Sequence, residues 1–175
     1  MIKEEMIRRN HVKMVAESMM TAARTAPKGC GIDDLEIAVL EGEELSVLSR
    51  TMREIGTRIG KDFFIRDAGN VDASQAVVLL GCRGAVRGLN CGLCGYAGCG
   101  AKPSAVPCSF DVTDLGIAVG AAVSVAADSR VDNRVMFSAG AAAREAGFLT
   151  ECCIVYAIPL SVSCKSIFFD RQQLR

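Results

Sequence analysis

The sequence lacks tryptophan and is poor in aromatic residues, which make up 5% of its 175 residues. Large aromatic rings therefore contribute little to the interior, and we expect a core built from Ala, Val, Ile, Leu and Met. The chain also lacks an excess of charge of one sign, because 20 basic residues balance 20 acidic ones. A neutral chain has no broad electrostatic attraction to nucleic acid, so we expect no nucleic-acid partner.

A long apolar run is missing as well. The most apolar stretch, 115–127, has about thirteen residues, whereas a membrane-spanning helix needs roughly 20. The opening segment MIKEEMIRRN is polar and charged, without the apolar stretch of a signal peptide. We therefore expect a soluble, cytoplasmic protein that does not bind a membrane.

Histidine occurs once and cysteine nine times. Thiols stay reduced in the cytoplasm, so cysteines in such number indicate metal or redox chemistry rather than disulfides. Three of them lie in CGLCGYAGC with the spacing Cys91-x2-Cys94-x4-Cys99, and Cys108 follows. Four thiolates around a glycine-rich segment are typical of iron–sulfur ligation, since glycine lets the backbone wrap a cluster and approach its sulfurs. We predict a 4Fe–4S cluster on these four cysteines.

Two alternatives remain open for this motif. Cys82, nine residues before Cys91, competes with Cys108 as the fourth ligand. Zinc competes with the cluster, although structural zinc sites usually combine two short cysteine pairs. Here only Cys91 and Cys94 form such a pair, so the spacing favours iron and sulfide.

The remaining pattern indicates an α+β fold, an α/β sandwich with a sheet flanked by helices. We predict a single domain, 1–175, in which the loop 82–108 is an inserted cluster-binding segment. The interval 63–67 reads as extended, 68–70 as a turn and 131–134 as a charged turn. The predicted helices are 4–24, 43–59, 111–128 and 135–146, and the predicted strands are 35–40, 76–81 and 152–158.

The predicted helix 111–128 is rich in small residues, including Gly116, Ala118 and Gly120. Small side chains let a second helix approach closely, either in the core or across a subunit interface, and we expect both, with a homodimer as the result. Asp111, Thr113 or Asp114 is expected to cap its start.

Six segments carry a resemblance to a known family. They are AARTAPKG at 22–29, RDAGN at 66–70, NCGLCGYAGC at 90–99, DLGIAVGAAVS at 114–124, VDNRVMFSAG at 131–140 and IPLSVSCKSIFFDR at 158–171. On these segments the chain resembles the ferredoxin domain-containing proteins of bacteria and archaea. The resemblance covers nearly the whole chain and implies a cluster on Cys91, Cys94, Cys99 and Cys108, but it implies no particular activity.

The first helix and its exit, AESMMTAARTAPKGCGID, resemble more distantly the opening of nitroreductase-like flavoproteins. This similarity implies a nitroreductase-like mixed sheet and raises FMN as a second cofactor. Flavin-binding members carry a segment of the type Arg-Arg-Ser-x-Arg ahead of that helix, and the absence of its third basic residue here counts against FMN. If a flavin is bound, the basic residues to test are Arg24, Lys28 and Lys165; otherwise they are helix-terminal or surface cations.

Three functions follow from these observations. The first is an iron–sulfur module that transfers single electrons to and from a redox partner protein. The second is a nitroreductase-like oxidoreductase that uses the cluster with a flavin. The third is a zinc-stabilised scaffold without catalytic activity. The sequence does not decide whether the protein is an enzyme.

Overall fold

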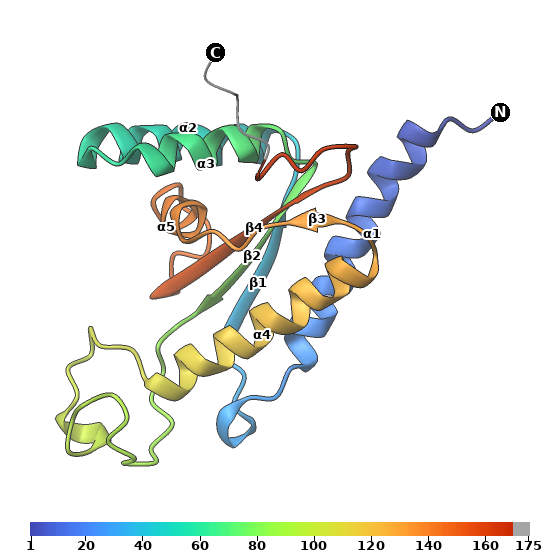
Figure 1. Ribbon diagram of the computed structural model, residues 1–175. Coiled ribbons are helices and arrows are strands. Elements are labelled where there is room, and N and C mark those ends of the chain that lie inside the picture. The colour runs from blue at the N-terminus through green and yellow to red at the C-terminus, as the bar shows by residue number, and fades with distance from the viewer. Residues whose placement is uncertain (170–175) are drawn as a thin grey trace.

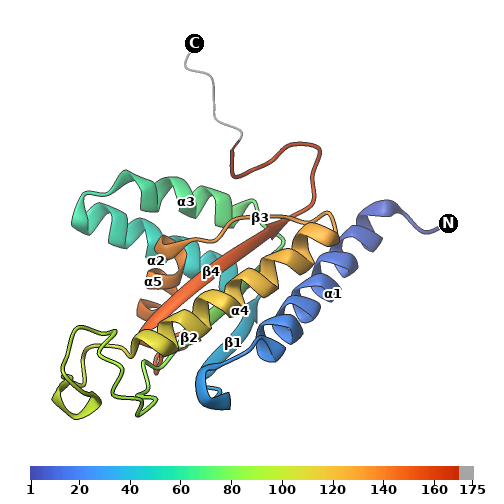
Figure 2. The ribbon, with the colours of Figure 1, turned by 60° about the horizontal axis from the view of Figure 1, so that its bottom comes forward.

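The computed structural model describes residues 1–169, which form a four-stranded sheet with helices on both faces (Figure 1). Helices α1 and α4 lie side by side on one face, and α2, α3 and α5 cover the other (Figure 2). This is the predicted α+β sandwich. The helices are α1 (Glu4–Thr25), α2 (Glu43–Ile59), α3 (Asp62–Asp72), α4 (Ser109–Asp128) and α5 (Phe137–Glu145); the strands are β1 (Leu35–Leu40), β2 (Ala76–Cys82), β3 (Asp132–Asn133) and β4 (Ile154–Ser161); the 3-10 turns are η1 (Gly29–Gly31) and η2 (Cys99–Ala101).

The strand order in the sheet is β1-β2-β4-β3. All three predicted strands are present, although β4 begins at Ile154 rather than at 152 and continues to Ser161. The resemblance to nitroreductases implied a mixed sheet, but every strand pairing among residues 1–169 is antiparallel. Each residue of β2 is buried, because helices cover this central strand on both faces, and its sequence is accordingly a continuous apolar run.

Helix α2 shows how an apolar pattern positions a helix. Leu45, Leu48 and Met52 recur at helical spacing and are buried in the core between the sheet and helices α2, α3 and α5. Gly60 ends the helix in the left-handed conformation, with φ 63° and ψ 44°, which glycine adopts without steric cost. Both ends of α2 lie where the sequence predicts them.

The segment 63–67, predicted as extended, and the predicted turn 68–70 are instead parts of α3. Phe64, Ala68 and Val71 recur at helical spacing and are buried. The run of three consecutive apolar residues at 63–65 conceals this spacing, because it resembles a short strand as closely as a helix. The prediction for this segment was therefore wrong.

Three further boundaries differ from the prediction. Helix α4 begins at Ser109 rather than at 111; Cys108 occupies its N-cap position, and no side chain caps the helix. Helix α5 begins at Phe137 rather than at 135. The predicted turn 131–134 contains β3, a polar strand that forms because it pairs with β4. The last two residues of the segment IPLSVSCKSIFFDR, 170 and 171, lie outside the described part of the chain.

Helix α5 packs directly onto β4 through Gly140. A Cβ atom at this position would lie 1.9 Å from the backbone oxygen of Val155, far inside van der Waals contact. Glycine is therefore required here by the close approach of two backbones, rather than by its own backbone angles.

Helix α4 is apolar on its outer side as well as on its buried side. Leu115 and Ala118 are buried in the core shared with α1, whereas Ile117 is 42% exposed and Gly116 and Gly120 adjoin open space. Within residues 1–169, α4 is the one helix whose length and composition would suit a membrane span, with 20 residues and a mean hydropathy of 1.5. The core helix of a soluble protein passes the same test, so this finding is weak evidence for a membrane.

Candidate metal centre

The cysteine motif lies in the loop 83–108, which connects the end of β2 to the start of α4 and extends beyond one end of the sheet (Figure 1). Apart from η2, the stretch 83–107 contains no helix or strand, as the sequence predicts. Gly84, Gly88, Gly92 and Gly95 have positive φ angles, so the backbone repeatedly reverses in ways that other residues rarely permit.

The four predicted ligands differ in exposure. Cys91 is exposed, Cys94 and Cys99 are half-buried, and Cys108 is buried at the base of the loop. Among residues 1–169, no three Cys, His, Asp or Glu side chains are grouped closely enough to hold a metal ion. The structure thus places all four thiols in one segment without gathering their sulfurs at one point. Because 91–98 contains no helix or strand, rearranging these residues would break no regular structure.

Asn90 and Cys99 fix each other across the motif. The Asn90 backbone N–H donates to the Cys99 Sγ atom at 3.3 Å, and the Cys99 backbone N–H donates to the Asn90 Oδ1 atom at 2.8 Å. Asn90 adopts a positive φ of 47°, which asparagine tolerates better than most residues. One predicted ligand therefore already accepts a backbone hydrogen bond of the kind that stabilises cluster sulfurs.

Cys108 lies where backbone donors converge. Burial raises the pKa of its thiol, but hydrogen bonds from the backbone N–H groups of Arg87, Asp111 and Phe110, together with the Arg87 charge, bring that pKa below its ordinary value. Two of these donors belong to the first turn of α4, whose free N–H groups favour negative charge. The site therefore stabilises a thiolate, the form of cysteine that binds metal.

Cys82, the alternative fourth ligand, lies in a different environment. It ends β2, where it pairs with Ile154, and it is buried. Burial raises the pKa of its thiol strongly, and Cys153 and Asp111 nearby raise it further. Cys82 is thus held as a neutral thiol within the sheet, an environment that suits a core residue.

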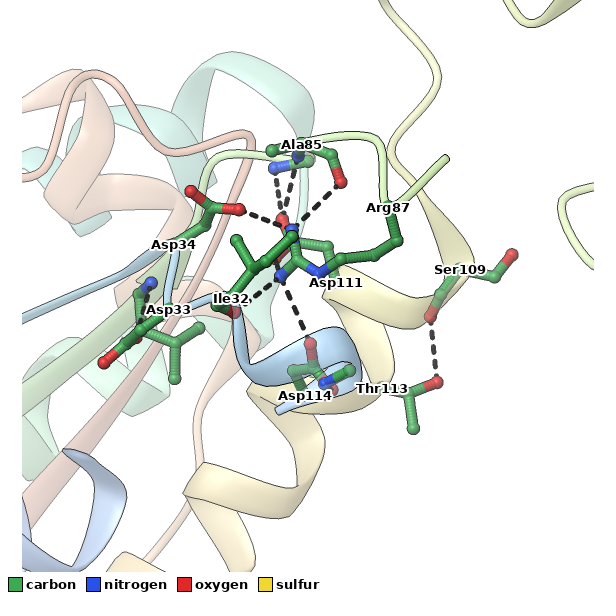
Figure 3. A network of polar contacts seen from close by, with 12 residues as sticks. Ile32, Asp33, Asp34, Ala85, Arg87, Ser109, Asp111, Thr113 and Asp114 are labelled. Atoms are coloured by element: carbon green, nitrogen blue, oxygen red, sulfur yellow. Dashed lines mark hydrogen bonds and ion pairs between the residues drawn. The ribbon is translucent and has the colours of Figure 1, made fainter. Parts of the chain in front are cut away.

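Arg87 is the residue that anchors the start of the loop (Figure 3). Its side chain is 1% exposed and forms ion pairs with Asp34, with Asp111 at 2.6 Å and with Asp114 at 3.2 Å. It also donates to the backbone oxygens of Ile32 and Ala85, both at 3.3 Å. Burial lowers the pKa of the guanidinium, but these carboxylates raise it above its ordinary value, so Arg87 stays charged.

The two aspartates of α4 also bind backbone. Asp111 accepts hydrogen bonds from the backbone N–H groups of Gly84 at 2.6 Å and Ala85 at 3.0 Å, and Asp114 accepts one from Gly29 at 2.9 Å. They were predicted as caps of α4, but they instead fasten the loop and η1 to the helix.

Sequence reasoning missed Arg87 and this network. Arg87 and Asp34 lie 53 positions apart, and no spacing rule joins residues so distant. The available signal was compositional: the loop contains basic residues but no acidic one, whereas two aspartates stand in the first turns of the largely apolar helix α4.

The cysteines outside the motif lie in the core or on the surface. Cys152 and Cys153 belong to the cores on opposite faces of the sheet, as predicted for neighbours in an extended chain, and burial raises the pKa of Cys152 to about 11. Cys30 and Cys164 are exposed and lie outside the loop.

The basic residues considered for a flavin have structural partners. Arg24 forms an ion pair with Asp33 at 2.7 Å. The Lys28 ammonium donates to three backbone oxygens at the end of α1, at 2.5–2.9 Å, and so acts as a helix-terminal cation. Lys165 lies in the segment after β4, where its backbone contacts Ser163. A cleft of about 380 Å³ that includes Arg8 and Arg9 lies by the start of β2, at the end of the sheet away from the cysteine loop.

Comparison with known proteins places this chain in a family. A family described as "Uncharacterized protein containing a ferredoxin domain (DUF2148)" matches residues 104–171. An uncharacterized protein of Archaeoglobus fulgidus is 38% identical over 98% of this chain and 97% of its own length. The chain belongs to the ferredoxin domain-containing family. The family description points to an iron–sulfur redox role, and the matched region includes Cys108 but not 91–99.

Among solved structures, this ferredoxin domain-containing chain is similar to a point mutant of the FMN- and NADPH-dependent nitroreductase NfnB from Sphigopyxis sp. strain HMH. The TM-score is 0.58 with 10% sequence identity, covering 91% of this chain and 83% of the other. This similarity confirms the nitroreductase-like fold, and at such low identity it concerns the fold alone.

The donor set fits an iron–sulfur cluster. Four unpaired thiols lie in one glycine-rich segment, and a backbone N–H group already donates to the sulfur of Cys99. In addition, the Nε atom of Arg87 is buried without a hydrogen-bond partner. Thiolates and N–H donors to their sulfurs are what cluster sites provide.

Proposed function

We propose that this protein is a single-electron redox module that holds a 4Fe–4S cluster on Cys91, Cys94, Cys99 and Cys108. The observation that carries the proposal is the position of Cys108, a buried thiol at the N-cap of α4, where the free backbone N–H groups of the first turn favour a negative charge. It lies in the same loop as the other three thiols, and the family is described as containing a ferredoxin domain.

A bound 4Fe–4S cluster takes up and returns one electron at a time, without making or breaking covalent bonds in the protein. The chain supplies thiolate ligands, N–H donors that offset the negative charge of the sulfurs, and the Arg87 network that fixes the start of the loop. In this proposal the protein works in the cytoplasm, where thiols stay reduced, and exchanges electrons with a separate redox protein.

Anaerobic purification tests the proposal, with iron, sulfide, zinc and flavin assayed on the same sample. We expect about four irons and four sulfides per chain, as for a 4Fe–4S cluster, and broad visible absorbance that bleaches on reduction. Zinc alone, with no iron after anaerobic reconstitution, would refute both redox functions and support a structural metal. FMN beside the cluster would instead support the nitroreductase-like oxidoreductase.

We also propose that the protein is a homodimer joined through the outer face of α4. That face exposes Ile117 and leaves open space at Gly116 and Gly120, so a second helix could approach closely. We expect light scattering after gel filtration to give twice the monomer mass, and Gly120→Arg to give the monomer mass. Gly69→Arg is the matched control, because Gly69 is an exposed helical glycine in α3 on the other face of the sheet. An unchanged mass for Gly120→Arg would place the interface elsewhere or exclude it.

A further inference from the structure

We infer that Arg87 is a positioning residue for the metal centre and that its Nε–H donates a hydrogen bond to a sulfur of the bound cluster, either the Cys108 thiolate or an inorganic sulfide. This inference rests on the proposed function, because it assigns a donor to the same site. It adds a residue that the cysteine motif does not contain.

The terminal nitrogens of Arg87 are fully used by the protein. Nη1 donates to Asp34 and to the backbone oxygen of Ala85. Nη2 contacts Asp111, Asp114 and the backbone oxygen of Ile32. These acceptors lie on three segments, namely the approach to β1, the loop itself and α4, so the guanidinium plane has a fixed orientation (Figure 3).

The fifth donor is left over. A guanidinium carries five N–H groups, and the one on Nε is buried and has no partner in the protein. Leaving a buried N–H unpaired is unfavourable, and native structures rarely do so without a ligand or water to complete the bond. The side chain is 1% exposed, so this donor is not simply hydrated by bulk solvent.

The same residue lies beside the fourth ligand. Its guanidinium pairs at 2.6 Å with Asp111, in the first turn of the helix whose N-cap position is Cys108, and the Cys108 backbone N–H donates to the backbone oxygen of Gly84 in the loop at 3.2 Å. The leftover donor therefore belongs to a residue at the base of the metal centre. A sulfur carrying negative charge is the acceptor that the proposed function brings to this place, and a cationic donor forms strong hydrogen bonds with such acceptors.

The contact has a measurable consequence. Reduction adds one negative charge to the cluster, and a hydrogen bond from a cation stabilises the more negative state, which raises the reduction potential. The three carboxylates around Arg87 act in the opposite direction, so the potential depends on keeping the donor in place. Arg87→Lys keeps one positive charge for the carboxylates but loses the planar donor at Nε.

The test compares wild-type holoprotein, Arg87→Lys and Arg83→Lys by spectroelectrochemical titration after iron and sulfide have been assayed. We expect Arg87→Lys to shift the one-electron equilibrium at least tenfold toward the oxidised state, about 59 mV. Arg83→Lys is the control, because Arg83 lies in the same loop but is half-exposed and pairs with Glu36. Equal potentials in all three loaded proteins would overturn the inference and assign the Nε–H to an ordered water.

A second measurement covers the case in which Arg87→Lys does not load iron. Wild-type protein labelled with ¹⁵N in the guanidinium groups of arginine is reduced and studied by pulsed electron paramagnetic resonance. A ¹⁵N coupling to the cluster spin is expected, and its absence overturns the inference. A wild-type protein that binds no iron would refute the proposed function itself, which is a different result.

Discussion

Replacing Cys94 by serine is expected to abolish cluster binding, leaving less than a tenth of the wild-type iron and sulfide. Cys94 lies at the centre of the motif, and a 4Fe–4S cluster depends on four thiolates that serine hydroxyls replace poorly. Iron, sulfide and visible absorbance after anaerobic reconstitution measure the effect, and circular dichroism checks that the fold persists. The matched control is Cys30→Ser, because Cys30 is an exposed thiol outside the loop. Its iron content should equal that of the wild type.

The same assay decides the fourth ligand. Cys108→Ser should lose the cluster, because its thiol is stabilised as a thiolate by backbone N–H groups. Cys82→Ser should retain it, because that thiol is buried in the sheet with a raised pKa. The reverse result would assign the fourth position to Cys82. Normal cluster content in both Cys94→Ser and Cys108→Ser would contradict the predicted ligand set as a whole.

Gly140→Ala is expected to cause the largest loss of stability among the Gly→Ala changes in this chain, because its added Cβ has the shortest contact of any glycine. The new Cβ would lie 1.9 Å from the Val155 backbone oxygen, so α5 must move away from β4 and carry its buried alanines with it. Overpacking of a core usually costs about 1–3 kcal/mol, and a clash with backbone, which cannot rotate aside, should reach about 3 kcal/mol or more. Chemical denaturation measures the free energy of unfolding.

The control for that experiment is Gly69→Ala. Gly69 is helical in α3 and exposed, and no atom lies within 4 Å of its added Cβ. Alanine should therefore raise the free energy of unfolding by about 0.5–1 kcal/mol, the usual difference between the two residues in a helix. A loss below about 1 kcal/mol for Gly140→Ala would mean that α5 adjusts freely, contrary to the close packing described above.

The sequence was most informative where the signal is local. The bounds of α2 and β1 were predicted because the apolar spacing and a terminal glycine act within a few residues. The spacing of Cys91, Cys94 and Cys99 is local in the same sense, which is why the candidate ligands could be named. Helix α3 was missed because three consecutive apolar residues hide its period.

The sequence was least informative where partners are distant. Strand β3 depends on pairing with β4, and its two polar residues show no strand pattern of their own. The buried charge of Arg87 is stabilised by carboxylates that the fold brings close from two other parts of the chain. Such contacts are consequences of topology, so neither composition nor periodicity reveals them.

The buried arginine also constrains how the loop can change during evolution. Asp111 and Asp114 belong to α4, but the charge that balances them comes from the loop. Removing one partner of a buried ion pair costs about 3–5 kcal/mol, a large part of the stability of a domain. A lineage that discarded the loop would therefore have to replace these aspartates at the same time. Arg87 in the loop and the two aspartates of α4 should therefore change together among relatives. A relative that lacks the cysteines but keeps both aspartates should also keep the arginine.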